Sequence, residues 1–275
     1  MLPCQYLDFL FHMALINFKL KHPDHIIPWG DAPHTNMHWF GLTDGEYWLD
    51  LGKATFYEYT NEVLAGVEGN SSNYVDYQIV RLIEDWTSLF ESIAEPVPDA
   101  FYGIAKSSSY LYRFYGAIQK WLEHAVDVEA EYDRYDKTVE WIYSRTLTAM
   151  HLTAGPGISF FRNKDNISIV WNADHVTENN IPIWTAQNGE VEMAYENFVN
   201  EIVDFGHRFF DAMDTQVRIA VEKDWGPVKV DKKRLVEEQE ERRMAFRKKL
   251  AVLTGEPAKH TDWEAINVLV TKMFS

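Results

Sequence analysis

The stretch from Met37 to Gly52, MHWFGLTDGEYWLDLG, constrains the fold most, because it predicts a β-hairpin that turns at Asp44-Gly45. An Asp-Gly pair between alternating apolar residues is typical of a tight two-residue turn, whose central residues need positive φ. Such a turn fixes which residues face each other across the two strands. One face of the predicted hairpin is then apolar and expected to be core: His38, Phe40, Leu42, Tyr47, Leu49 and Leu51.

The opposite face of this predicted hairpin carries two indoles and two carboxylates. Aromatic rings beside carboxylates can bind sugars, cations or bases. We therefore predict a binding surface formed by Trp39, Trp48, Glu46 and Asp50. Two other interpretations stay open. The face is a second buried layer, or Trp48 covers the bare backbone of Gly41 as a sheet-stabilising pair.

The rest of the chain predicts an α+β fold, in which antiparallel hairpins or meanders pack against amphipathic helices. A second hairpin, Ile158 to Trp171, turns within residues 163–166 and has Ile158, Phe160, Ile167, Ile169 and Trp171 on one face. Further strands are expected at residues 15–20, 54–59, 181–185 and 190–193. Helices are expected at residues 75–93, 111–125, 139–150, 195–221, 232–253 and 263–273.

Two halves of the chain share an order of elements, each with a hairpin, a further strand and an aromatic-rich helix. This order is compatible with two similar halves, but convergent α+β packing is the favoured explanation. We divide the chain into an N-terminal extension (residues 1–13, with Met13 as an alternative start), an α+β body (14–228) and a C-terminal helical segment (229–275). The centre of the charged helix, residues 237–243, contains no apolar side chain. We therefore expect that helix to project from the body or to pack at one end only.

Charge and composition narrow the classes of partner. The net charge of −16 argues against nucleic acid and anionic membranes, and an acidic body would attract a basic protein partner. The single cysteine, Cys4, excludes an internal disulfide, so we expect a reducing, cytoplasmic location. No run of apolar residues is long enough for a membrane span. Nothing in the sequence calls for a cofactor, and it does not indicate an oligomeric state.

Few residue patterns suggest chemistry. The glycine-rich phosphate loop, HExxH, CxxC and GxSxG motifs are all absent. Weak metal candidates are four histidines within seventeen residues, whose spacing matches no known zinc finger: His22, His25, His34 and His38. A stripe on the helix at 195–221 (Asp204, His207, Asp211, Asp214) and the adjacent Asp174 and His175 are further weak candidates, which more simply are solvated side chains.

Several segments together resemble an uncharacterised bacterial family, a domain of unknown function. They are Pro28-Trp29-Gly30, HWFGLTDG from His38 to Gly45, Tyr47-Trp48, Glu95-Pro-Val-Pro98, Arg145 with Leu147, Gly155-Pro156 and Trp171. The resemblance covers most of residues 14 to about 220 and departs at Thr148, where an acidic residue is common. It implies a bacterial origin and a soluble single chain, and it implies no reaction or catalytic residue.

Two functions follow as hypotheses. The first is a protein-interaction module, in its most specific form an immunity-type protein that neutralises a bacterial toxin, because acidic inhibitors associate rapidly with basic enzymes. The alternative is a small-molecule-binding protein or enzyme with its pocket at the Trp39 and Trp48 face. A metal-dependent enzyme using the four histidines is a third reading. Whether the chain catalyses any reaction stays open.

Overall fold

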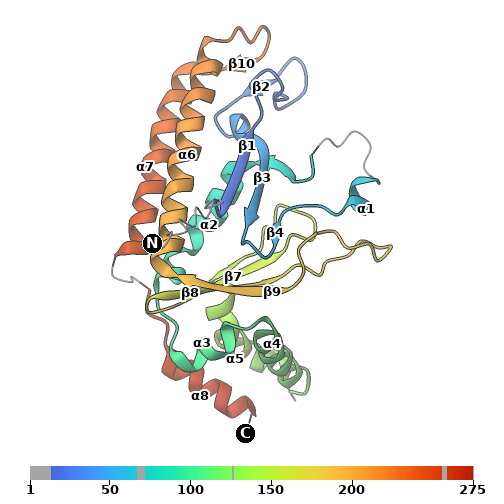
Figure 1. The fold of residues 1–275 in the computed structure, drawn as a ribbon, viewed down its shortest axis with the longest axis vertical. Helices are drawn as coiled ribbons and strands as arrows, with labels where there is room; N and C mark the ends of the chain where they lie inside the picture. Colours follow the sequence, from blue (N-terminus) through green and yellow to red (C-terminus); the bar gives the residue numbers. More distant parts are fainter. Residues whose placement is uncertain (1–13, 67–71, 126, 256–258, 275) are drawn as a thin grey trace, which may run out of the picture.

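Two antiparallel sheets, a short parallel pair of strands and the helices around them form the structure, a computed structural model that describes residues 14–66, 72–125, 127–255 and 259–274 (Figure 1). The predicted α+β class, with antiparallel sheets and C-terminal helices, is confirmed. The predicted N-terminal extension, residues 1–13, lies outside the described residues. No helix in the described part of the chain is both long and apolar enough to cross a membrane.

The strands and helices follow one another along the chain with these bounds. The strands are β1 (Ile16–Leu20), β2 (Asn36–Met37), β3 (Asp44–Asp50), β4 (Thr55–Phe56), β5 (Val75–Gln78), β6 (Thr146–Leu147), β7 (Gly157–Asn163), β8 (Asn166–Asn172), β9 (Gly189–Ala194) and β10 (Lys229–Val230). The helices are η1 (Gly41–Thr43), α1 (Asn61–Leu64), α2 (Ile79–Ala94), α3 (Asp99–Ala105), α4 (Ser108–Glu123), α5 (Val128–Tyr143), α6 (Tyr195–Glu222), α7 (Lys232–Thr254) and α8 (Trp263–Phe274).

The first sheet shows that the predicted hairpin at Asp44-Gly45 is wrong. Strand β3 begins at Asp44, and its neighbours are β1 on one side and β4 and β5 on the other. The residues before it form a turn and the 3-10 helix η1 instead of a strand. The core face of β3 was predicted correctly, because Tyr47, Leu49 and Leu51 are buried, but the partner of Tyr47 is Phe18 rather than Leu42.

Gly45 has a different role from the one that the sequence suggests. A Cβ atom placed on it would lie 2.4 Å from the main-chain oxygen of Lys19, so the glycine permits the close approach of β1. The chain turns instead at Gly52, which has a φ of +73° and whose N–H donates to Asp50 Oδ1 over 2.7 Å. Gly52, and not Gly45, is therefore the glycine of a turn, and that turn lies between β3 and β4.

The second sheet is a meander in the order β6-β7-β8-β9, and it confirms the predicted second hairpin. Asn163 pairs with Asn166, so the turn consists of Lys164 and Asp165. The side chains predicted to share a face all lie in the larger core: Ile158, Phe160, Ile167, Ile169 and Trp171. The expected strand at 190–193 is β9, whereas residues 181–185 form only isolated bridges. The two sheets do not share a strand order.

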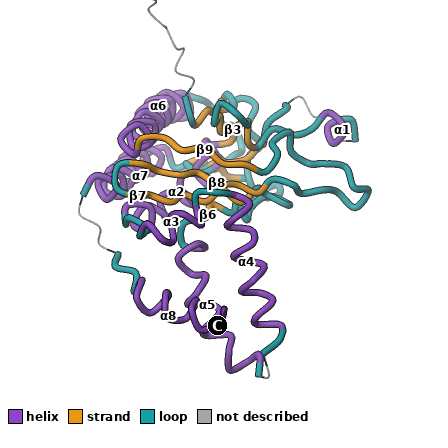
Figure 2. The backbone as a smooth tube through the Cα atoms, turned by 60° about the horizontal axis from the view of Figure 1, so that its bottom comes forward, coloured by secondary structure: helices purple, strands orange, loops and turns teal. Residues whose placement is uncertain are grey.

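The strands β7 and β8 separate two hydrophobic cores. Phe160 and Trp171 point into the larger core, which they share with the first sheet, α2, α6 and α7. Phe161 and Val170 point the other way, into a smaller core formed with α3, α4, α5 and α8. Figure 2 shows these four helices together on one side of the sheet. Because successive side chains of a strand alternate, one pair of strands serves both cores.

Helices α6 and α7 lie side by side along one flank of the molecule (Figure 1). The prediction that α7 projects or packs at one end is wrong, because its buried residues run from Leu235 to Leu253. At the polar centre, Gln239 is buried and accepts a hydrogen bond of 2.8 Å from Trp39 Nε1. Its Nε2 donates to Phe210 O and to Asp214 Oδ1. At this contact between α7 and α6, hydrogen bonds of Gln239 therefore take the place of apolar packing.

A buried ion pair joins the end of α2 to the end of α5. Arg145 is fully buried, and its Nη2 donates to Glu95 Oε2 over 2.6 Å while its Nη1 donates to Trp141 O. The Glu95 carboxylate also accepts hydrogen bonds from the N–H and Oγ1 of Thr261, just before α8. The Arg145 guanidinium lies 5.5 Å from the ring of Trp263. Burial, the largest cause, lowers the pKa of Arg145, and Glu95 opposes this by stabilising the cation.

We expect removal of one member of this pair to cost more than removal of both. Glu95→Leu leaves an uncompensated buried guanidinium and should lower the free energy of unfolding by about 3–5 kcal/mol. The double variant Glu95→Leu, Arg145→Met should recover most of that loss. Urea unfolding followed by circular dichroism measures both, and a double variant no more stable than Glu95→Leu would contradict the interpretation.

A glycine sets the spacing of the α6–α7 contact. A Cβ on Gly206 would lie 2.2 Å from the ring of Phe246, so Gly206→Ala should destabilise the protein by about 1–3 kcal/mol through overpacking. Gly116, inside α4, has no atom within 4 Å of its Cβ position. As the matched control, Gly116→Ala should stabilise the protein by roughly 0.5–1 kcal/mol. Thermal melting of both variants tests this difference in sign.

Candidate functional site

A large hollow lies between helices α4 and α5 and the strands β6, β7 and β8. It encloses about 850 Å³, which is within the rough range of 300–1,000 Å³ for ligand sites. We call it the tyrosine groove. Its lining is Ser108, Ser109, Leu111, Tyr112, Arg113, Tyr115, Gln119, Tyr135, Tyr143, Thr146, Thr148, Gly157, Ser159, Val170, Trp171, Asn172, Asp174 and Asn188.

Four tyrosines from two helices form the helical wall of the groove. Tyr112 and Tyr115 belong to α4, and Tyr135 and Tyr143 belong to α5. The rings of Tyr115 and Tyr143 are 5.7 Å apart. A hydrogen bond with Tyr143 raises the pKa of Tyr135 to about 12. Burial, followed by its tyrosine neighbours, raises the pKa of Tyr115. Tyr115 and Tyr135 therefore stay neutral at physiological pH.

Hydroxyl groups also line the floor, where the strands meet α5. The oxygens Thr146 Oγ1 and Ser159 Oγ are 2.7 Å apart, and Thr146 Oγ1 also donates to Ile142 O over 2.8 Å. Since the Thr146 proton is used by that carbonyl, Ser159 donates to Thr146 and keeps acceptor capacity toward the groove. The floor therefore offers neutral hydrogen-bonding groups beside the apolar side chain of Val170.

Acidic groups lie at the edge of the groove. Asp174 Oδ2 accepts a hydrogen bond of 3.0 Å from Asn188 Nδ2, and the carbonyl oxygen of the same amide accepts from Ala173 N. On the neighbouring strand β9, Glu190 Oε2 accepts from the N–H of Ser108 over 3.0 Å. Hydrogen bonds from Ser108 lower the pKa of Glu190. Both carboxylates are therefore held in place by the chain.

The lining side chains are mostly neutral hydrogen-bonding groups and aromatic rings. They include hydroxyls, amides and aromatic rings, together with one carboxylate, Asp174, and one guanidinium, Arg113. A nucleophile needs an adjacent base, and an acid–base pair needs two titratable groups in reach of the substrate. Among the described residues that line the groove there is no imidazole or thiol, and the arrangement suits hydrogen bonding and ring contact with a ligand.

The surface predicted from the hairpin is not formed, because Trp39 and Trp48 lie in different places. Trp39 is fully buried between α2, α6 and α7, with Arg242 stacked 4.5 Å from its ring. Trp48 lies on the half-exposed face of β3 together with Glu46 and Asp50, as the alternation predicted. Its ring stacks on Tyr74 at 4.2 Å. The separation follows from η1, which turns the chain before β3 begins.

The four candidate metal ligands are also distributed along the loop before η1. His22 and His25 lie edge to face at 6.3 Å, and His22 Nδ1 accepts from Asp24 N. His38 packs 4.7 Å from Trp29, and burial lowers its pKa. Among the described residues, no three His, Cys, Asp or Glu side chains are placed to hold a metal ion.

A carboxylate–imidazole–phenol chain, which the sequence analysis did not predict, lies at the edge of the larger core. Asp85 Oδ2 is 3.1 Å from His151 Nδ1, and His151 Nε2 is 2.7 Å from the hydroxyl of Tyr47. The Tyr57 hydroxyl is buried nearby with no partner in the described part of the chain. None of the three hollows described here is lined by these residues. Their role is to tie the loop after β6 to α2 and β3.

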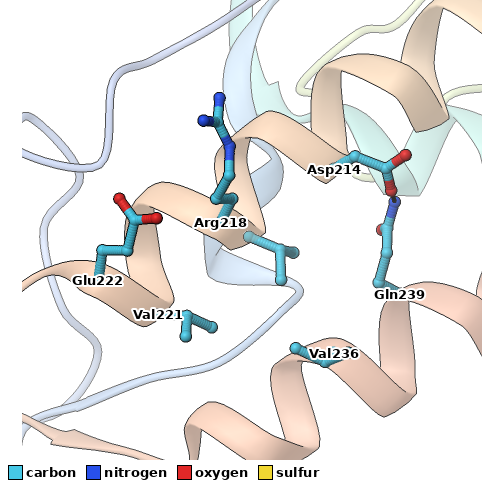
Figure 3. A pocket seen from close by; sticks show the side chains of 7 residues that line it. Asp214, Arg218, Val221, Glu222, Val236 and Gln239 are labelled. Atoms are coloured by element: carbon cyan, nitrogen blue, oxygen red, sulfur yellow. Dashed lines mark hydrogen bonds between the residues drawn. The ribbon is translucent and has the colours of Figure 1, made fainter.

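A smaller hollow of about 340 Å³ lies between α6 and α7 (Figure 3). In Figure 3, Gln239 points toward Asp214, while Arg218 and Glu222 extend from α6 at the other end. Val217, Val221 and Val236 supply its apolar surface. Asp214 of the predicted acidic stripe therefore holds α7, and Asp204 pairs with Arg208 at 2.6 Å. The carboxylates of this stripe therefore hold α7 on α6 or form ion pairs at the surface.

The carboxylate of Glu190 gives a pH-dependent prediction. Its folded-state pKa is lowered, so its contribution to stability is present above the usual Glu pKa and is lost as pH falls through the lowered value. Glu190→Gln should therefore melt below the wild type at pH 7, by an amount equivalent to less than about 1 kcal/mol because the carboxylate is exposed. The two melting temperatures should converge in acid. A constant difference from pH 7 to pH 3 would argue against the assignment.

Comparison with known proteins gives a family and no further relative. No curated protein and no solved structure matches the chain. Residues 15–269 match the model of a family of unknown function, DUF5984, which confirms the predicted membership in an uncharacterised family. The match includes both sheets, both cores and the tyrosine groove, and the chain therefore belongs to DUF5984.

Proposed function

We propose that this chain is a protein-interaction module that binds a basic segment of a partner protein in the tyrosine groove. The observation that carries the proposal is the composition of the groove, in which tyrosines, serines, threonines and side-chain amides predominate. Antibody combining sites use the same residue types. Tyrosine gives a large contact area at a low entropy cost, and small polar side chains adapt their hydrogen bonds to the partner.

The exposure of the tyrosines supports the same proposal. Tyr112 is 74% exposed and Tyr143 is 52% exposed, so both rings have area to bury against a partner. Aromatic side chains of this kind supply much of the binding energy in protein interfaces. Their hydroxyls can donate to or accept from the main chain of a bound segment.

Charge around the groove supports a basic partner. Residues 165–194, which include β8, β9 and Asp174, contain five acidic residues and no Lys or Arg. Residues 127–143, which include α5, contain six acidic and two basic residues. An acidic field of this kind speeds association with a basic protein and disfavours acidic ones.

In its most specific form, the proposal is that this chain is an immunity-type inhibitor, as its acidic sequence suggests. Such a protein neutralises a toxin by covering the surface through which the toxin acts. The direct test is to express the neighbouring open reading frames of the native host singly and with this chain. Toxicity that this chain relieves supports this form of the proposal, and the absence of any toxic neighbour contradicts it.

A small molecule is the second candidate occupant, favoured by the volume of about 850 Å³. The sequence analysis placed this pocket at Trp39 and Trp48, and we now place it in the tyrosine groove. Salt separates the candidates, since binding of a basic segment should weaken as ionic strength rises, whereas binding of a neutral small molecule should not.

Two tyrosines on the same helix provide a matched test. Tyr143 lines the groove and Tyr132 does not, and each is 52% exposed. With a partner co-purified from the native host, Tyr143→Ala should weaken binding at least about ten-fold, as for an interface anchor. Tyr132→Ala should change affinity by less than about three-fold, as for residues outside an anchor. Titration calorimetry at two salt concentrations measures both. Failure to recover a stoichiometric partner, or equal effects of the two variants, would refute the proposal.

A further inference from the structure

The strand β9 is the outer strand of the second sheet and has an open edge. The sheet order is β6-β7-β8-β9, so β9 pairs with β8 on one side only. Within the described residues, no main-chain hydrogen bond reaches the other side of β9 between Gly189 and Ala194. Glu190, Glu192 and Ala194 are exposed. Six residues of strand edge are therefore accessible to another extended chain.

The register shows which main-chain groups point outward. Asn163 and Asn166 flank a two-residue turn, so Asn166 is bonded toward β7. Hydrogen-bonding direction alternates along a strand, and Ile167, Ile169 and Trp171 consequently bond toward β9. Their partners on β9 are Met193, Val191 and Gly189. The N–H and C=O groups of Glu190 and Glu192 and the N–H of Ala194 therefore point away from the sheet, whereas the C=O of Ala194, the N-cap of α6, accepts the first hydrogen bond of that helix.

Most of the usual protections of an edge strand are missing here. Exposed edges are normally blocked by proline, charged side chains, a bulge or a covering element, and β9 has only the charges of Glu190 and Glu192, which a cationic strand would neutralise. β9 contains no Pro or Lys, and its residues pair one to one with those of β8, without a bulge. Its two carboxylates are turned under the sheet, where Glu190 accepts from Ser108 N and Glu192 accepts from the hydroxyl of Tyr102 over 2.6 Å.

These features connect the edge to the groove. Ser108 lines the groove and also bonds Glu190, so an added strand beside β9 would continue the groove surface. Side chains of that strand on the Glu190 and Glu192 side would meet negative charge. Those on the opposite side would lie beside Val191 and Met193, which pack on the larger core. Alternating cationic and apolar side chains would match both faces.

We infer that the partner of this chain binds as an additional β-strand along β9, through an extended segment that alternates Lys or Arg with apolar residues. This inference rests on the proposed function and adds the mode of binding. The main-chain groups of Glu190, Glu192 and Ala194 supply the pairing, and the two carboxylates select the cationic side chains.

A synthetic peptide tests the pairing directly. The probe is an acetylated, amidated octapeptide, Lys-Val-Lys-Ile-Lys-Val-Lys-Tyr, titrated into the full-length ¹⁵N-labelled protein. At saturation, the amide protons of Glu190, Glu192 and Ala194 should exchange with solvent at least about ten-fold more slowly, because strand pairing removes them from water. If the peptide does not bind, or if these three amides exchange at an unchanged rate, the inference is wrong.

Proline variants give an independent measurement. Ala194 has φ −60° and ψ 134°, which proline adopts without strain, and Ala194→Pro removes one outward N–H with no change of charge. Glu192→Pro removes a central outward N–H, and Glu192→Ala is its control for loss of the carboxylate. Peptide affinity should fall at least about ten-fold further in Glu192→Pro than in Glu192→Ala, and a smaller loss is expected for Ala194→Pro. Equal affinities of Glu192→Pro and Glu192→Ala would overturn the inference. If Glu192→Pro does not fold, the peptide affinity of Ala194→Pro and the amide exchange rates still test the inference.

The two proposals fail in different ways. A native partner that is lost in Tyr143→Ala but retained in Ala194→Pro and Glu192→Pro would leave the protein-interaction proposal intact and reject strand addition. A chain with no stoichiometric partner would fail at the level of the proposed function, whatever the peptide does.

Discussion

The arrangement of helices under the second sheet depends on the buried ion pair between Glu95 and Arg145. Two buried charges are costly, and they are tolerated here because each also makes a hydrogen bond to a fixed group outside the pair, Arg145 to Trp141 O and Glu95 to Thr261. The pair fixes where α2 ends, where α5 ends and where the chain enters α8. The position of α5 in turn places Tyr135 and Tyr143 over the sheet. Both charged residues also belong to the segments that resemble the family, which gives those segments a structural explanation.

Prediction from sequence succeeded where neighbours along the chain determine the structure. The hairpin from Ile158 to Trp171 has a two-residue turn and a strict alternation, and both signals act within fourteen residues. The long helix α6 follows its apolar spacing closely. The prediction of the first hairpin failed because Asp44-Gly45 resembles a turn in sequence, although the glycine at this position has another role. Gly45 is required by β1, which contacts it from residues 16–20, and no local pattern distinguishes close approach from a turn.

The candidate site was missed for a related reason. The groove forms only when α4, α5 and three strands converge, and its tyrosines are separated by up to 31 residues. The spacing of Tyr112 with Tyr115, three residues apart on one helix, was the available signal, but tyrosines at helical spacing are usually core. For Trp39 the error was the opposite, because a residue predicted to lie on a binding surface is fully buried. Its indole nitrogen is satisfied by Gln239, 200 residues away, and this partner made a conspicuous tryptophan part of the packing.

The sheet that separates the two cores has a consequence for communication within the molecule. Ser159 and Val170 line the groove, while their neighbours Phe160, Ile169 and Trp171 pack against the first sheet and helices α2 and α6. A shift of β7 or β8 by a fraction of an ångström is felt on both faces, because close-packed interiors transmit strain. An occupant of the groove that shifts these strands would therefore also shift their packing against α2 and α6. By reciprocity, a change on that side that moves the strands would alter affinity in the groove.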